Sequence, residues 1–178
     1  MDTFIALLRG INVSGQKKVP MANLRQLFTE TGFEKVKTYI QSGNVVFQSA
    51  EDDVQKIERK IQKAIKDSFD FEVPVLVKTP SQLQQIFKAC PFAQEKKENS
   101  YFVMLYSIPE KELVDRLKEI SYPNETFSIT ENCVYFYCST GYGQAKMNNN
   151  FFERKLKVTA TARNNKTMVK LIAMLAES

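Results

Sequence analysis

The chain has 178 residues, of which 43% are hydrophobic and 25% charged, with a formal net charge of +5. This composition is typical of a globular protein long enough to bury a sizeable core. The sequence contains no histidine, which excludes Ser-His-Asp and Cys-His catalytic arrangements and the usual zinc sites. We therefore expect no metal and no cofactor. An enzyme of this sequence would have to use carboxylates, lysine, tyrosine or electrostatic positioning.

The apolar runs are short, and the longest, such as Phe4 to Leu8, fall far below the roughly 20 residues that span a bilayer. A strand follows the first two residues without a signal peptide, so we expect a cytoplasmic protein with no membrane partner. The cysteines Cys90, Cys133 and Cys138 lack the paired spacing of metal ligands and are expected to be reduced core residues. The sequence leaves the oligomeric state open.

Residues 1–79 predict the order β-α-β-β-α-β, which is the ferredoxin-like unit. The periodicity of apolar residues, with Pro20 and Gly32 as helix boundaries, carries this prediction. The expected elements are a strand at 4–8, a helix between Pro20 and Gly32, strands at 36–40 and 44–48, a helix from Asp52 to about Ser68, and a strand at 73–78.

Residues 100–163 repeat this order after a connecting segment at 80–99. The expected elements are a connecting helix at 81–90, a strand at 101–106, a helix at 109–120, a hairpin of strands at 126–130 and 133–138, a helix at 149–156, a weak strand at 158–161, and a last helix from Asn165 to Leu175 within 164–178. The sequence therefore predicts a duplicated ferredoxin-like α+β fold with extra connecting and C-terminal helices. No linker rich in glycine, serine or proline separates the halves, so we expect one compact body. Several strands are apolar at successive positions, which indicates that both faces of each sheet are covered.

The basic residues are unevenly distributed, since Gln144 to Lys170 contain seven cationic residues against one glutamate. Such asymmetry is compatible with a phosphate or nucleic-acid partner, although solvated helix surfaces also produce it. A second basic stretch is RGINVSGQKKV, which joins the first strand to a helix. Glycines at such a turn can expose backbone amides to an anion. The candidate ligands there are Arg9, Asn12, Lys17 and Lys18; the alternative is that Gly10 and Gly15 only allow the chain to turn.

Two further turns could bind an anion. In CSTGYGQAK, Gly141 and Gly143 free the backbone, and Lys146 supplies a positive charge. In TARNN, Arg163 and the helix cap Asn164 stand where a helix begins and its dipole favours anions. A permissive surface loop and simple helix capping are the alternative interpretations.

The RNA-recognition fold has the same order of elements, but SGNVVFQS retains only Gly43 of its aromatic consensus. In the second half, Tyr135 and Tyr137 could stack on bases, although core packing is the more common role for such residues. A nucleic-acid partner is therefore supported by charge alone.

Four segments, RGINVSGQKKVPM, TYIQSGNVVF, GQAK with FFERKL, and TARNN with KTMVKL, resemble in this order the bacterial domain-of-unknown-function family numbered 1697. The resemblance covers nearly the whole chain and implies a duplicated ferredoxin-like fold, with no established activity or cofactor. It implies signature positions at Arg9, Gly10, Asn12, Gln41, Ser42, Gly43, Asn44, Lys146, Arg163 and Asn164. The chain departs from the family at Asn165, where tryptophan is common.

We expect the loop after the first strand and the turn of the first hairpin to lie at opposite ends of their sheet, so that Arg9 and Ser42 share no site within one half. Three functions remain open on the sequence. The first is a binding protein for a phosphorylated small molecule or nucleic acid that uses Lys146, Arg163 and Asn164. The second is an enzyme acting on a nucleotide or phosphosugar by electrostatic stabilisation. The third is a protein-interaction scaffold.

Overall fold

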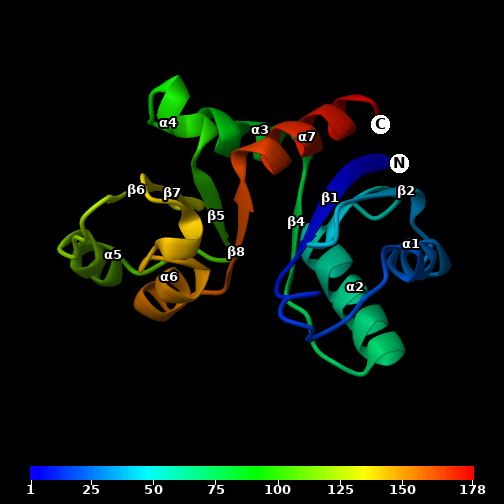
Figure 1. The fold of residues 1–178 in the computed structure, drawn as a ribbon. Coiled ribbons are helices and arrows are strands. Elements are labelled where there is room, and N and C mark those ends of the chain that lie inside the picture. The colour runs from blue at the N-terminus through cyan, green and yellow to red at the C-terminus, as the bar shows by residue number, and fades with distance from the viewer. The chain divides into compact units, whose positions relative to one another are not determined.

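The computed structural model describes residues 1–178, which form two compact units (Figure 1). Unit 1 contains Met1–Gln84 together with Lys170–Ser178, and unit 2 contains Gln85–Val169. None of the helices combines the length and the apolar character needed to cross a membrane.

Unit 1 is built on a four-stranded antiparallel sheet with the strand order β2-β3-β1-β4. Its elements are β1 (Asp2–Leu8), α1 (Met21–Glu30), β2 (Glu34–Tyr39), β3 (Asn44–Ser49), α2 (Val54–Phe69) and β4 (Val75–Lys78). The predicted β-α-β-β-α-β order is confirmed. The helix α2 begins two residues later than predicted, because the Asp53 carboxylate accepts a hydrogen bond from the Lys56 amide and caps the helix there.

Unit 2 repeats this arrangement with the strand order β6-β7-β5-β8, which confirms the duplicated ferredoxin-like fold. Its elements are β5 (Tyr101–Leu105), α5 (Lys111–Lys118), β6 (Glu125–Ile129), β7 (Cys133–Cys138), the 3-10 helix η1 (Tyr142–Gln144), α6 (Asn149–Leu156) and β8 (Ala160–Asn164). The helices α3 (Pro80–Lys88), α4 (Gln94–Glu98) and α7 (Asn165–Ala176) are additions to the repeat. The sequence did not predict α4 or η1, and β8 lies further along the chain than the predicted 158–161.

One backbone hydrogen bond illustrates the duplication. The Leu8 N–H donates to Gly43 O at 2.9 Å at the end of β1, and the Leu105 N–H donates to Asn132 O at 2.8 Å at the end of β5. Each bond joins the exit of a central strand to the turn of the following hairpin. The two halves therefore share strand register as well as element order.

The central strands β1, β3, β5 and β7 are almost entirely buried, as expected from their continuous apolar sequences. Part of the second face of the unit 2 sheet is covered by the α3 end of that unit. There Phe87 stacks on Phe102 with ring centroids 5.5 Å apart, and the Tyr135 hydroxyl donates to Ile86 O at 2.6 Å. The prediction of two covered faces is thus confirmed for the part of the unit 2 sheet around Phe102 and Tyr135. The three cysteines are unpaired and buried, as predicted.

The predicted separation of the first loop and the first hairpin turn is wrong. In this topology β1 and β2 run in the same direction with β3 antiparallel between them, so the end of β1 and the turn after β2 lie at the same end of the sheet. The Asn12 amide nitrogen donates to Gln41 O at 2.8 Å and directly joins the two segments.

Two of the edge strands have side chains bonded to their outward backbone groups. On β4 the Val77 N–H donates to Glu58 Oε1 at 3.0 Å. On β8 the Ala160 N–H donates to Glu153 Oε2, and Ala160 O accepts from Asn149 Nδ2, both at 2.9 Å. The outward groups at these positions are therefore unavailable to another strand.

Candidate functional site

A hollow of about 520 Å³ lies at one end of the unit 2 sheet, where β7 and β8 end and β5 begins. These three strands are neighbours, so the loops that follow or precede them converge at this point. The lining residues are Glu98, Asn99, Ser100, Tyr101, Tyr137, Cys138, Ser139, Gly141, Tyr142, Asn164 and Lys166.

A tight turn after β7 forms one wall of the hollow. Gly141 has φ 95° and ψ 149°, a conformation that is essentially restricted to glycine. Its N–H donates to Cys138 O at 3.1 Å, and its carbonyl accepts from the Gln144 N–H at 3.1 Å. The glycine therefore allows the chain to leave the strand and enter η1 at once.

Tyr142 fixes this turn to the sheet. Its ring stacks on Tyr101 with centroids 3.9 Å apart and an interplanar angle of 17°, and its hydroxyl accepts a hydrogen bond from the Asn149 N–H at 3.1 Å. Burial raises the pKa of Tyr142. The phenol therefore stays protonated at neutral pH and can donate a hydrogen bond.

The far end of the same loop is held by Glu125 on β6. Its carboxylate accepts hydrogen bonds from the amides of Lys146 at 3.1 Å and Met147 at 2.8 Å. The loop is thus bonded at both ends, which holds its glycine turn against the hollow.

The start of α7 forms the opposite wall. Asn164 Oδ1 accepts from the Thr167 N–H at 2.8 Å, and the Asn165 N–H donates to Ser100 O at 3.1 Å. The N-terminus of a helix favours negative charge, and Lys166 in the first turn adds a cation to the lining. The lining also contains one acidic residue, Glu98, which would repel an anion. An anion would therefore have to lie close to Lys166 and the amides of the first turn of α7.

The structure brings together only some of the residues predicted from the two C-terminal turns. Gly141 and Asn164 line the hollow, whereas Gly143, Lys146 and Arg163 do not. Lys146 Nζ lies 5.0 Å from the centroid of the Tyr122 ring. The predicted pairing of Lys146 with Arg163 is therefore not found around this hollow.

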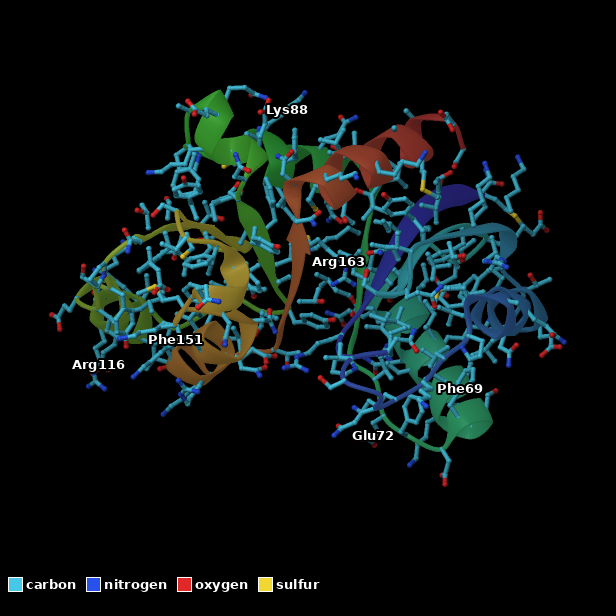
Figure 2. All side chains as sticks on the ribbon, viewed as in Figure 1. Phe69, Glu72, Lys88, Arg116, Phe151 and Arg163 are labelled. Carbon is cyan, nitrogen blue, oxygen red and sulfur yellow. The ribbon has the colours of Figure 1, made fainter.

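Arg163 lies on β8 (Figure 2). Only 6% of its surface is exposed. Its Nη1 donates to Thr161 Oγ1 at 2.7 Å and to Ala162 O at 2.9 Å. Burial lowers the pKa of Arg163 to about 10, so the side chain remains cationic at neutral pH. Arg163 therefore lies within β8, buried, and not at the exposed start of α7.

The N-terminal candidates lie in unit 1 and include residues with clear structural contacts. Asn12 Oδ1 accepts from the Val19 N–H at 2.8 Å, while its amide nitrogen donates to Val19 O at 3.0 Å. Lys17 Nζ donates to Glu72 O at 2.7 Å. Lys18 is exposed. The Arg9 backbone N–H donates to Pro74 O at 3.0 Å.

The hairpin signature positions also have structural roles. A Cβ atom on Gly43 would lie 2.7 Å from Leu8 Cβ, and its φ is 86°. Asn44 is completely buried, and its Nδ2 donates to Tyr39 O and Ser42 Oγ, both at 2.9 Å. At the start of the loop Gly10 has φ 73°. These contacts explain the segment around 41–44 as a packed turn.

Sequence reasoning missed Ser100, Tyr101 and Lys166 as lining residues. Lys166 could have been found, since it follows Asn164 by two residues within the basic stretch. Ser100 and Tyr101 carry no signal in the sequence, because only the pairing of β5 with β8 brings them beside Asn164. Tyr135, considered for base stacking, is 1% exposed and unavailable for it.

Comparisons with known proteins identify a family and a fold. A family model described as "Protein of unknown function (DUF1697)" matches residues 1–135. The structure is similar to that of the conserved bacterial protein SP0830 from Streptococcus pneumoniae, with a TM-score of 0.76, 24% sequence identity, and coverage of 97% of this chain and 98% of that one. The search of curated proteins gave no match. Most of the hollow lies beyond the segment that the family model matches.

Proposed function

Since this chain belongs to the DUF1697 family, whose members are described as proteins of unknown function, we propose a function from its own geometry. The chain binds a phosphorylated small molecule in the hollow where β7 and β8 end and β5 begins. The phosphate group lies near the first turn of α7, and the organic part lies against the tyrosine side of the hollow.

The convergence of two features on one hollow carries this proposal. The start of α7, with Asn164 and Lys166, provides the positive end of a helix dipole and an ammonium group. The glycine turn at Gly141 faces the same space from β7. The start of α7 alone could be explained by helix capping, and Gly141 alone by a turn in the chain. Together they offer a phosphate monoester hydrogen-bond donors and positive charge from two sides.

The remaining lining residues favour a small organic phosphate over free phosphate. Tyr101, Tyr137 and Tyr142 supply aromatic surface, and Ser139 supplies a hydroxyl group. Ligand sites commonly combine apolar and aromatic walls with a few placed polar groups. A volume of about 520 Å³ lies within the range of small-molecule sites.

Binding is a better interpretation than catalysis at the loop after β7. The raised pKa of Tyr142 keeps its proton in place, which suits a hydrogen-bond donor and not a general base. A small ligand is also favoured over an oligonucleotide, because Tyr135 is buried under the α3 end of unit 2 and its hydroxyl is bonded to Ile86 O.

The test is a thermal-shift and calorimetric screen of the purified protein against orthophosphate, nucleoside monophosphates, phosphosugars and short single-stranded oligonucleotides at low and high salt. A ligand at about 100 times its dissociation constant adds roughly 2.7 kcal/mol to the free energy of unfolding. We expect a salt-tolerant shift from an organic phosphate that Lys166→Ala reduces. Lys170→Ala removes the same charge one turn further along α7, outside the lining, and should leave the shift unchanged.

A second pair of variants tests the glycine turn. Gly141→Ala forces a side chain onto a residue with positive φ and should weaken binding of the same ligand. Gly143→Ala is the control, because Gly143 has no positive φ and a Cβ atom there would meet no neighbour within 4 Å. Equal loss in Lys166→Ala and Lys170→Ala, or a shift only from oligonucleotides that disappears at high salt, would contradict the proposal.

A further inference from the structure

The outer edge of β6 presents unpaired backbone groups. In the hairpin, the Thr130 N–H donates to Cys133 O at 2.9 Å and the Ser139 N–H donates to Asn124 O at 2.9 Å. Backbone groups of an antiparallel strand alternate in direction, so the even-numbered residues of β6 face β7. The N–H and C=O groups of Phe127 and Ile129 therefore point away from the sheet, and β6 is an edge strand.

The other three edge strands are protected, two by a glutamate side chain and one by a shift in register. The Glu58 carboxylate accepts a hydrogen bond from the Val77 N–H of β4, and the Glu153 carboxylate accepts one from the Ala160 N–H of β8. On β2 the register shifts between Glu34 and Lys37, which interrupts the strand.

Bulges, charges and bonded side chains are the usual means by which proteins prevent an edge from pairing. The β6 strand, ETFSI, has no bulge, and its one charged side chain, Glu125, is bonded to the loop after η1. The Glu125 N–H donates to Tyr122 O at 3.3 Å, and none of these protections covers Phe127 and Ile129.

A groove of about 420 Å³ runs beside this open edge. Its lining residues are Lys118, Ile120, Ser121, Glu125, Phe127, Ser128, Ile129 and Met147. Ile120, Phe127 and Met147 make part of it apolar, while Lys118 adds a positive charge. The Glu125 carboxylate keeps its negative charge but is held against the amides of Lys146 and Met147, whereas Lys118 is exposed and can face a partner.

We propose that β6 binds an extended peptide segment of a partner protein, which adds a fifth strand to the unit 2 sheet. The N–H and C=O groups of Phe127 and Ile129 pair with the peptide backbone, as in strand addition by peptide-binding domains. Alternate side chains of the peptide enter the apolar part of the groove, and an acidic side chain lies opposite Lys118. This inference rests on the outer edge of β6, and its groove shares no lining residue with the hollow.

The test selects peptides from a random decapeptide display library on the full chain and then measures synthetic copies by calorimetry. We expect selected peptides to alternate apolar residues and to carry an acidic one. Binding should protect the amides of Phe127 and Ile129 from hydrogen exchange. Methylation of alternate peptide nitrogens should abolish binding, because the added strand depends on backbone hydrogen bonds.

Variants on β6 make the test specific. Ser128→Lys fills part of the groove with a long side chain whose charge would be buried under the apolar residues of the peptide, and it should weaken binding about tenfold, comparable to the loss of one or two hydrogen bonds. Thr126→Lys is the matched control, since Thr126 lies on the same face of the same strand but is exposed and outside the groove. Ile129→Pro removes an outward N–H without removing a bond to β7, and circular dichroism checks that each variant is folded.

Three results would overturn the proposal. The first is a library that yields no peptide able to distinguish the unaltered chain from folded Ser128→Lys. The second is selected peptides that protect amides elsewhere and bind both lysine variants equally. The third is protection of Phe127 and Ile129 that increases with protein concentration in the absence of peptide, which would identify a second copy of the chain as the occupant.

Discussion

Gly43 has no room for a side chain. Its φ of 86° and the positions of Leu8 and Ile11 act together, because a Cβ atom would approach Leu8 Cβ to 2.7 Å and Ile11 Cδ1 to 2.9 Å. The residue thus sets how closely the hairpin turn packs on the exit of β1. A glycine in the sequence indicated a turn, but the close approach follows only from the packing.

Gly43→Ala should therefore lower the free energy of unfolding by about 3 kcal/mol, since backbone strain and overpacking add. Gly15→Ala is the control, because Gly15 has φ 74° but a Cβ atom there would meet no neighbour within 4 Å, and the change should cost about 1 kcal/mol. Urea unfolding measures both. Equal losses would show that φ alone, and not the contact with Leu8, limits this position.

Asn12 connects three parts of the chain through one side chain. Its amide bonds to both backbone groups of Val19 and to Gln41 O, at distances between 2.8 and 3.0 Å. Its φ of 55° also suits asparagine or glycine better than most residues.

We expect Asn12→Gly, which keeps the backbone conformation and removes the three side-chain bonds, to destabilise unit 1 by about 2 kcal/mol. Limited proteolysis should then cut the loop at Lys17 or Lys18 faster than in the unaltered chain. A loop that stays as resistant as before would show that Gln41 and Val19 do not depend on this side chain.

At the residue scale, the sequence predicted part of the hollow. Gly141 and Asn164 were found because turns and helix caps have local signatures. Arg163 was misjudged, since the sequence placed it at a helix start and the structure places it within β8, where side chains alternate between faces. Lys146 was chosen for its charge, but charge in a sequence does not say in which direction a side chain extends.

Among the elements, the edge strands show how side chains from one element complete another. The carboxyl of Glu58 on α2 reaches the Val77 N–H of β4 and is partly withdrawn from solvent. Burial raises the pKa of Glu58, an effect that the bond from Val77 and the charge of Lys78 partly offset. Burial also lowers the pKa of Lys78.

The pH dependence follows from the direction of this shift. A carboxyl whose pKa is raised on folding binds its proton more readily in the native state, so its contribution to stability is largest below pH 4.5 and is lost as pH rises through the raised pKa. Glu58→Gln retains an acceptor for the Val77 N–H and does not titrate. As pH rises from 4.5 through the raised pKa of Glu58, we expect the free energy of unfolding of Glu58→Gln, measured with urea, to fall less than that of the unaltered chain. If the two free energies change in parallel with pH, Glu58 is not the group responsible.

Element boundaries were predicted less well than element order. The start of α2 depends on which of several adjacent acidic residues caps the helix, and the structure selects Asp53. The extension of β8 to Asn164 depends on pairing with β5, which is distant in the sequence. The short helix α4 has no apolar face to reveal it, since its residues are QEKKE.

Across the whole molecule, the duplication was predictable because the order of strand and helix patterns repeats, even though the residues differ. Its geometry was predicted incorrectly at one point, the relative position of the β1 exit and the first hairpin turn. That error came from tracing strand directions and not from the residues, because antiparallel pairing of β1 and β2 with β3 fixes both at one end.

Each unit has its own apolar cluster, and Phe47 lies in that of unit 1, where its ring contacts Phe4, Phe28 and Phe33. Phe47→Ala should cost about 4 kcal/mol through the cavity it creates. We expect amide exchange to accelerate in unit 1 and to remain nearly unchanged in residues 85–169, since local stability follows cooperative units. Equal acceleration throughout the chain would show that the two units unfold together.

The composition of the units also sets an order for folding during synthesis. Unit 2 is continuous in sequence, from Gln85 to Val169, whereas unit 1 includes Lys170–Ser178 from the end of the chain. A ribosome releases the residues of unit 2 before it releases the final segment of unit 1. The half that is synthesised first is therefore the half that is completed last, and until then it must persist without the last two turns of α7.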